Sequence, residues 1–410
     1  MLFFLRAFRH GFYGYLLALL IACDRGPEPL PDIHPVTPIP ANPGLSASAR
    51  ALLVRLSESY GKATLSGQVD YKEEGRYVAA DYIAQTAGRR PVIVGLDLME
   101  YSPSRQAFGA DPDNLIEDAI KMAQEQGVVL TFTWHWNAPM HLRNDDREPW
   151  WRGFYARATQ FNLRQALRNP ESAEYQALLR DIDAIAGQLK HLAEADIPVL
   201  WRPLHAAEGR WFWWGARGPE AFKDLWRLMF VRMTDLHGLD NLIWVITAEE
   251  EDWYPGDDVV DIIGVDAYPS DQDALLRDYW TPLLKRHNGR KMIALTEFGG
   301  VPLIEEMQQE GILFSYFVSW TDNNRGKLGP MSVPVEHLQR VYQSPAVITL
   351  DEWHDESGWH DLSKQSSAGG VAPPADPLIK PEEPQPGPAL ELEQKSEKKP
   401  EQKPEESKIS

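Results

Sequence analysis

Short apolar runs alternate with longer amphipathic segments over most of this 410-residue chain. Several runs are continuously apolar, as expected for strands that are covered on both faces. The strand candidates are Ala63–Ser66, Val92–Leu96, Val128–Trp134, Val199–Pro203, Leu242–Ile246, Ile262–Asp266, Met292–Glu297 and Phe314–Trp320. The helix candidates between them are Leu115–Gln126, Ala173–Ala195, Pro219–His237 and Asp271–His287. This order predicts an α/β fold, a (β/α)8 TIM barrel. An open doubly wound sheet competes, but no Gly-rich phosphate loop supports it.

Polar and aromatic residues follow the predicted strands at their carboxyl ends. His135 comes after the third strand, His205 after the fourth and Tyr268 after the sixth, while Glu297 and Trp320 end the last two. Barrel enzymes carry their chemistry at the carboxyl ends of the strands, so these side chains are expected to meet there. The sequence therefore predicts one site at this face.

The segment 201–215 reads WRPLHAAEGRWFWWG and combines charged groups with a run of four aromatic residues, Trp211 to Trp214. Flat aromatic faces beside fixed polar groups suit a pyranose, whose C–H face is apolar and whose rim carries hydroxyls. The alternative is a core built of tryptophans. The aromatic run follows neither a period of 2 nor one of 3.6 and lies in a Gly-bounded loop, which favours the sugar-binding interpretation.

This segment resembles the acid/base motif of glycoside hydrolase family 26, the β-mannanase family, in which Arg-Pro-Leu-His is followed by a proton-donating Glu. Here Ala206 follows His205. The run Thr296-Glu297-Phe298-Gly299-Gly300 resembles the nucleophile motif of that family. The resemblance covers roughly residues 48 to 350 and implies that Glu297 attacks the anomeric carbon. Retaining enzymes place a second carboxyl, the acid/base, about 5–5.5 Å from the nucleophile. The resemblance implies that Ala206 holds the position of this second carboxyl here.

The same resemblance assigns substrate contacts. It implies that His135 and His205 bind the sugar in the −1 subsite, that Tyr268 hydrogen-bonds the nucleophile, and that Trp320 forms the floor under this sugar. It places Trp211 on the aglycone side and Trp151 along the cleft. Each of these residues could instead pack in the core. The resemblance implies no cofactor and no metal.

Ala206 cannot donate a proton, and two nearby carboxyls could in principle replace the missing one. Glu208 lies two positions further along a turn, so its side chain is expected to point elsewhere; Glu100 would approach from a different direction. Neither is expected to substitute. The chain is then either a long-lived pseudoenzyme or an active enzyme with one substituted residue. The intact neighbours Glu297, Tyr268 and Trp320 favour the second explanation.

The resemblance implies a retaining β-mannanase-like hydrolase for β-1,4-linked mannan, galactomannan or manno-oligosaccharides. Its catalysis is expected to be strongly impaired, because Ala206 replaces the acid/base Glu. We expect the protein to be a monomer. Other β-glucans and xylans are further possible substrates. The alternative is a non-catalytic surface glycan-binding protein on the same scaffold. A metal-dependent hydrolase that uses His135 and His205 is disfavoured, since neither belongs to a ligand-spaced pair such as HExxH. A net charge of −19 argues against nucleic acid as a partner.

The N-terminus has the features of a secretion signal. Basic residues precede an apolar run from Phe12 to Ala22 that is short for a membrane span. The run ends Leu20-Ile21-Ala22-Cys23, which resembles a bacterial lipobox and implies cleavage before Cys23 and lipidation of its thiol. An ordinary signal with an incidental Cys is the alternative. We therefore expect a lipid-anchored protein of the bacterial cell envelope, in the inner or the outer membrane.

The expected domain boundaries follow composition. Residues 1–22 form the signal peptide, and residues 23–47 a lipidated Cys with a Pro-rich extended tether. Residues 48–355 form the barrel. The tail 364–410 is rich in Pro, Glu and Lys, has almost no aromatic residues, and is expected to be disordered.

Overall fold

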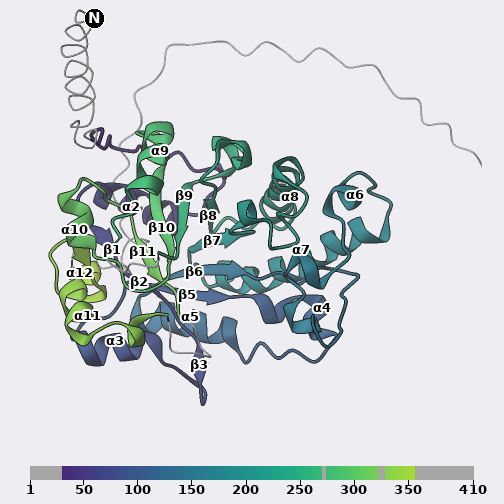
Figure 1. Ribbon diagram of the computed structural model, residues 1–410, viewed down its shortest axis with the longest axis horizontal. Coiled ribbons are helices and arrows are strands. Elements are labelled where there is room, and N and C mark those ends of the chain that lie inside the picture. Colours follow the sequence, from purple (N-terminus) through teal and green to yellow (C-terminus); the bar gives the residue numbers. More distant parts are fainter. Residues whose placement is uncertain (1–29, 270–273, 322–327, 356–410) are drawn as a thin grey trace, which may run out of the picture. The chain divides into compact units, whose positions relative to one another are not determined.

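The computed structural model describes residues 30–269, 274–321 and 328–355. Eight parallel strands close into a barrel in the order β10-β11-β2-β5-β6-β7-β8-β9 (Figure 1). The barrel strands are β2 (Gly67–Val69), β5 (Ile93–Asp97), β6 (Val129–Trp134), β7 (Val199–Pro203), β8 (Leu242–Thr247), β9 (Ile262–Ala267), β10 (Met292–Phe298) and β11 (Phe317–Ser319). The predicted (β/α)8 barrel is confirmed.

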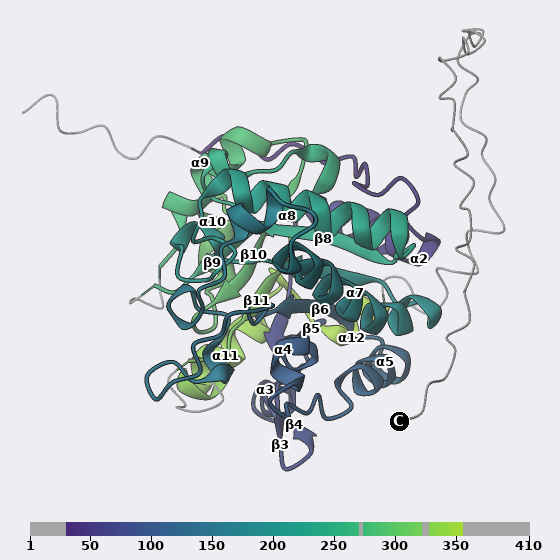
Figure 2. The ribbon, with the colours of Figure 1, turned by 90° about the vertical axis from the view of Figure 1, so that its right-hand side faces the viewer.

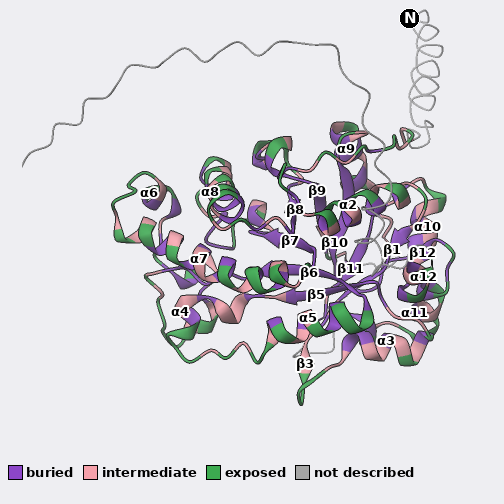
Figure 3. Ribbon diagram, turned by 180° about the vertical axis from the view of Figure 1, so that it is seen from behind, coloured by how far each residue is buried: buried purple, intermediate pink, exposed green. Residues whose placement is uncertain are grey.

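Helices surround these strands, as Figures 1 and 2 show. They are α2 (Ala47–Ser59), α3 (Ala79–Ala87), α4 (Pro103–Gln106), α5 (Leu115–Gln126), α6 (Leu163–Leu167), α7 (Ala173–Glu194), α8 (Pro219–Val231), α9 (Arg277–His287), α10 (Ile304–Gln309), α11 (Val335–Tyr342) and α12 (Leu350–Asp355). The strands are almost wholly buried, whereas the helices alternate buried and exposed residues (Figure 3). This contrast explains why strands appeared in the sequence as continuous apolar runs and helices as periodic ones.

The predicted helices match closely. Helix α5 has the predicted bounds and ends at Gly127, whose φ of 67° is the left-handed conformation that glycine adopts without strain. Helix α7 begins behind Ser172, whose hydroxyl accepts a hydrogen bond from the backbone N–H of Tyr175 at 3.1 Å. The predicted helix at 271–287 is described only from residue 274, and α9 begins at Arg277.

The first predicted strand, Ala63–Ser66, is wrong as a barrel strand. Its central residues form β1 (Thr64–Leu65), which pairs outside the barrel with β12 (Val347–Ile348). The barrel strand is β2, which begins at Gly67. A Cβ atom at Gly67 would lie 2.5 Å from the backbone oxygen of Phe317, so only glycine lets β2 approach β11 this closely. A short antiparallel hairpin, β3 (Lys72–Glu73) with β4 (Arg76–Tyr77), follows β2.

Part of the segment expected to form the tether, from residue 30 onward, packs on the barrel. Val36, Ala41 and Leu45 are buried in the core cluster. The backbone N–H of Ala41 donates to Asp261 at 2.7 Å, and Asn288 binds the segment near its start. A Pro-rich segment lacks the periodicity of a helix or a strand, but it can still pack on a folded domain. These contacts could therefore not be predicted from composition.

The signal peptide, Cys23 and the tail 364–410 lie outside the described residues, and their assignments stay predictions. No helix within the described ranges is long and apolar enough to cross a membrane.

Candidate active site

A cavity of about 490 Å³ opens at the carboxyl ends of the barrel strands. Its walls come from the strand ends and loops that follow β6 to β11. The lining residues are His135, His205, Ala206, Glu208, Gly209, Trp211, Phe212, Thr247, Glu249, Glu250, Asp266, Tyr268, Tyr279, Glu297 and Trp320. Six of the residues singled out from the sequence therefore meet in one cavity with Ala206: His135, His205, Trp211, Tyr268, Glu297 and Trp320.

The buried carboxylate of Glu297 lies on β10 and is held by one donor on β7 and one donor directly after β9. The guanidinium of Arg202, from β7, donates to Oε1 of Glu297 and, at 2.9 and 3.0 Å, to the two carboxylate oxygens of Asp266. The hydroxyl of Tyr268 donates to Oε2 of Glu297 at 2.6 Å. Both oxygens of Glu297 are thus oriented, and the buried charge is compensated.

This network shifts the ionisation of its members. Burial raises the pKa of Asp266 to about 6, against the lowering effect of Arg202. Burial, together with the negative charge of Glu297, raises the pKa of Tyr268, so the phenol stays protonated and acts as a donor. Arg202 is only 2% exposed and carries the positive charge shared by the two carboxyls.

A second chain of hydrogen bonds links β5, β6 and β7 under the cavity. The carboxylate of Asp97 contacts Nδ1 of His135, and Nε2 of His135 lies 3.1 Å from Nε2 of His205. Burial opposes the charge of Asp97, but its bonds to His135 outweigh this and lower the pKa of Asp97. Burial holds the pKa of His205 well below its usual value, so His205 is neutral. A neutral His205 beside a carboxylate-anchored His135 can orient sugar hydroxyls.

The aromatic run after His205 divides into two roles. Trp213 and Trp214 are 1% and 0% exposed, and their indole N–H groups donate to the carbonyls of Trp136, at 2.6 Å, and His205, at 2.9 Å. They fasten the loops that follow β6 and β7. Trp211, by contrast, is 51% exposed and lines the cavity. The run therefore combines buried core tryptophans with one exposed ring on the cavity wall, and the sugar-binding role of that ring stays a prediction.

One sequence expectation about the cavity needs correction. Glu208 was expected to point elsewhere, yet it lines the cavity, because the loop turns tightly: Ala206 has a φ of 49° and a short 3-10 turn, Ala207–Gly209, follows it. Trp151 is 52% exposed and is not among the residues that line this cavity, so its place along the cleft stays a prediction; its carbonyl accepts a hydrogen bond from Arg105 at 2.8 Å. Arg105 also pairs with Glu100, which does not line the cavity.

Sequence reasoning missed Arg202, Asp266 and Asp97 as functional residues. All three are charged residues within or at the end of otherwise apolar strands. That position was the available signal, because a charge at the end of a buried strand is unfavourable unless it is paired.

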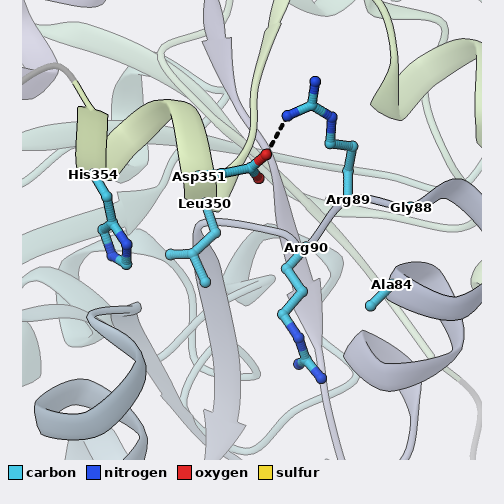
Figure 4. Close-up of a pocket in the computed structure, with 7 residues that line it drawn as sticks. All are labelled: Ala84, Gly88, Arg89, Arg90, Leu350, Asp351 and His354. Atoms are coloured by element: carbon cyan, nitrogen blue, oxygen red, sulfur yellow. Dashed lines mark hydrogen bonds and ion pairs between the residues drawn. The ribbon is translucent and has the colours of Figure 1, made fainter.

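A second hollow, of about 300 Å³, lies near the start of β5 (Figure 4). Arg89 there pairs with Asp351, while the neighbouring Arg90 pairs with Asp81. Both arginines of this hollow thus have an acidic partner. The hollow lies at the N-terminal face of the barrel, the end that is associated with stability. Within the described residues, no group of three His, Cys, Asp or Glu side chains is placed to hold a metal ion.

The sequence model of glycosyl hydrolase family 26 matches residues 41–352. The chain belongs to this family. Its match covers every strand of the barrel and every residue that lines the cavity, so the cavity is the candidate active site of a family 26 barrel.

Relatives with assigned names agree with this membership. A mannan endo-1,4-beta-mannosidase of Thermothelomyces thermophilus is 44% identical over 350 residues, which are 85% of this chain and 68% of the relative. Mannan endo-1,4-beta-mannosidase A of a Piromyces species is 30% identical over 83% of this chain, which spans only 55% of that relative. The chain thus represents part of the length of these relatives.

Solved structures show the same fold. A GH26-CBM35 beta-(1,4)-mannanase of Podospora anserina is 42% identical, with a TM-score of 0.73 over 82% of this chain and 71% of that chain. A beta-mannanase from a symbiotic protist of the termite Reticulitermes speratus, complexed with a gluco-manno-oligosaccharide, is 33% identical, with a TM-score of 0.67 over 78% and 99%.

Proposed function

We propose that this chain is a retaining β-mannanase-type glycosidase whose proton donor is missing at position 206. The observation that carries the proposal is the carboxylate of Glu297, oriented by Arg202 and Tyr268 inside a cavity that also contains Trp320 and Ala206. The names of its family 26 relatives support β-1,4-linked mannan as the substrate.

In the proposed mechanism, an oxygen of Glu297 attacks the anomeric carbon of the sugar in the −1 subsite. A glycosyl-enzyme forms as the bond to the leaving oxygen breaks, and water later releases the sugar. Trp320 offers its ring to this sugar, while His135 and His205 bind its hydroxyls. A Glu at position 206 would protonate the leaving oxygen and then activate the water. With Ala206, both steps lose their proton-transfer group.

The direct test is Ala206→Glu compared with the parent chain on mannohexaose. Loss of a general acid/base costs about 10²–10⁴-fold in rate, so the Glu form should be faster by that factor and should retain anomeric configuration. Ala206→Gln is the matched control, because it has the same size but carries no proton to transfer.

An unchanged rate in Ala206→Glu would contradict the assignment of position 206. If that form binds manno-oligosaccharides but cleaves none, the glycan-binding alternative is correct instead. We further propose lipid anchoring through Cys23 in the bacterial cell envelope, which rests on the lipobox-like sequence Leu20-Ile21-Ala22-Cys23.

A further inference from the structure

Three glutamates line the cavity without any part in the mechanism above: Glu250 is exposed, whereas Glu208 and Glu249 are partly buried. Glu208 lies in the turn after β7, and Glu249 follows β8 directly. One oxygen of Glu208 accepts a hydrogen bond from the backbone N–H of Glu250 at 2.9 Å, which ties the two loops together. The two carboxyls therefore stand on adjacent loops of one wall.

The backbone beside Glu208 is shaped to bring an aromatic ring to the same wall. A Cβ atom at Gly209 would lie 1.6 Å from the ring of Trp211. Only glycine leaves room for this ring to fold against the turn. Trp211 is half-exposed and lines the cavity, so it presents an apolar face next to the carboxyl of Glu208.

This wall faces the leaving half of a bound substrate. In a retaining hydrolysis the acid/base stands beside the leaving oxygen, and Ala206 holds that position. Glu208 lies two residues beyond Ala206, in the turn after β7, and β7 is not a neighbour of the β10 strand that carries Glu297.

The charge on the wall is negative and depends on pH. Burial raises the pKa of Glu208 to about 7, and burial with the nearby charge of Glu208 raises that of Glu249 to about 8. Glu250 and Asp266 add negative charge from the loop after β8 and from β9.

Besides His135, His205, Tyr268 and Glu297, described above, helix α9 brings two further groups to the wall. Tyr279 lines the cavity beside Glu249, and the guanidinium of Arg286 donates to the backbone carbonyl of Glu249 at 2.9 Å. The positive charge of Arg286 lowers the pKa of Glu208 but does not cancel the effect of burial. No Lys or Arg is found among the described residues that line the cavity.

We propose that Glu208 and Glu249 receive the leaving sugar through its hydroxyls and select a neutral or cationic leaving group against an anionic one. A carboxyl group accepts hydrogen bonds from hydroxyls when ionised and can donate one when protonated. An anionic leaving group would meet like charge on a wall without a cation. The inference rests on the proposed function, since it assumes that a glycosidic bond is broken in this cavity.

The test uses the parent chain with two aryl β-mannobiosides. Each substrate has an activated nitrophenyl leaving group, which needs no proton from position 206. The nitrophenyl ring of one substrate also bears a carboxamide, and that of the other bears a carboxylate. We measure kcat/KM for each substrate at pH 6 and pH 9. Glu208→Gln, Glu249→Gln and the double variant are compared with Glu251→Gln, which removes one charge from the same loop but does not line the cavity.

At pH 9 the parent and Glu251→Gln should prefer the carboxamide substrate by about tenfold or more. The preference should shrink toward pH 6, where the two carboxyls take up protons, and should fall to about twofold or less in the double variant at either pH. A preference that is equal in all forms would overturn the inference while leaving the function intact. If neither substrate is cleaved by the parent chain or by Ala206→Glu, the proposed function itself fails.

Discussion

Replacing Arg202 with Met tests the charge network that holds the candidate nucleophile. Arg202 is nearly fully buried and compensates both Glu297 and Asp266. Its loss leaves two buried carboxyls without a cation, and removing one partner of a buried ion pair costs about 3–5 kcal/mol. We expect the free energy of unfolding at pH 8 to fall by about that amount.

The loss of stability in Arg202→Met should depend on pH. Burial already raises the pKa of Asp266 to about 6, and without the positive charge of Arg202 this pKa should rise further. A carboxyl whose pKa is higher in the folded than in the unfolded state contributes stability that is present below its unfolded pKa and is lost as pH rises through its folded pKa. Arg202→Met should therefore be closer to the parent at pH 5 than at pH 8.

Urea unfolding followed by tryptophan fluorescence at pH 5 and pH 8 measures this difference. The double variant Arg202→Met, Asp266→Asn should recover part of the loss at pH 8, because only one uncompensated carboxyl is left. Arg217→Met, at an exposed position, controls for the loss of a charge as such. Equal stability of Arg202→Met and the parent at pH 8 would refute the proposed role of Arg202.

Three further outcomes are expected. Trp320→Ala should weaken the binding of all manno-oligosaccharides that fill the −1 subsite, whereas Trp211→Ala should weaken the binding of only the longer ones. Each loss, measured by calorimetry, should be about 0.5–1.5 kcal/mol beyond the loss of buried area. Unchanged affinities would place both rings outside the binding site. Cys23→Ser should move the protein from the membrane fraction to the soluble fraction without changing sugar affinity, and persistent membrane association would disprove the anchor. Burial and the nearby charge of Arg290 lower the pKa of His287 to about 4, so stability should fall as pH drops from about 6.5 toward 4. His287→Phe should flatten that slope in thermal unfolding, and an unaltered slope would exclude His287 as its source.

The sequence alone predicted the barrel because its evidence is local. A strand covered on both faces must be apolar along its whole length, and an outer helix must be apolar along one stripe. Helix α5 and strand β7 therefore have the bounds that the pattern indicated. Strand β2 was missed, because three residues with a glycine carry too little periodicity to be recognised.

The sequence also predicted that Glu297, Tyr268 and His205 lie at one end of the barrel, since each follows or ends an apolar run. It did not indicate their partners. Arg202 lies on β7, Asp266 on β9 and Glu297 on β10, so their shared hydrogen bonds depend on how the closed barrel brings the ends of these strands together. No spacing in the sequence encodes that contact.

The roles within the aromatic run were decided only by the tertiary structure. Trp211, Trp213 and Trp214 are the same residue type within four positions, yet two donate to carbonyls of the loops after β6 and β7 and the third faces the cavity. The left-handed turn at Ala206 likewise brings Glu208 to the cavity wall. Residue type fixes which bonds a side chain can make, whereas backbone direction and distant neighbours decide which bonds it does make.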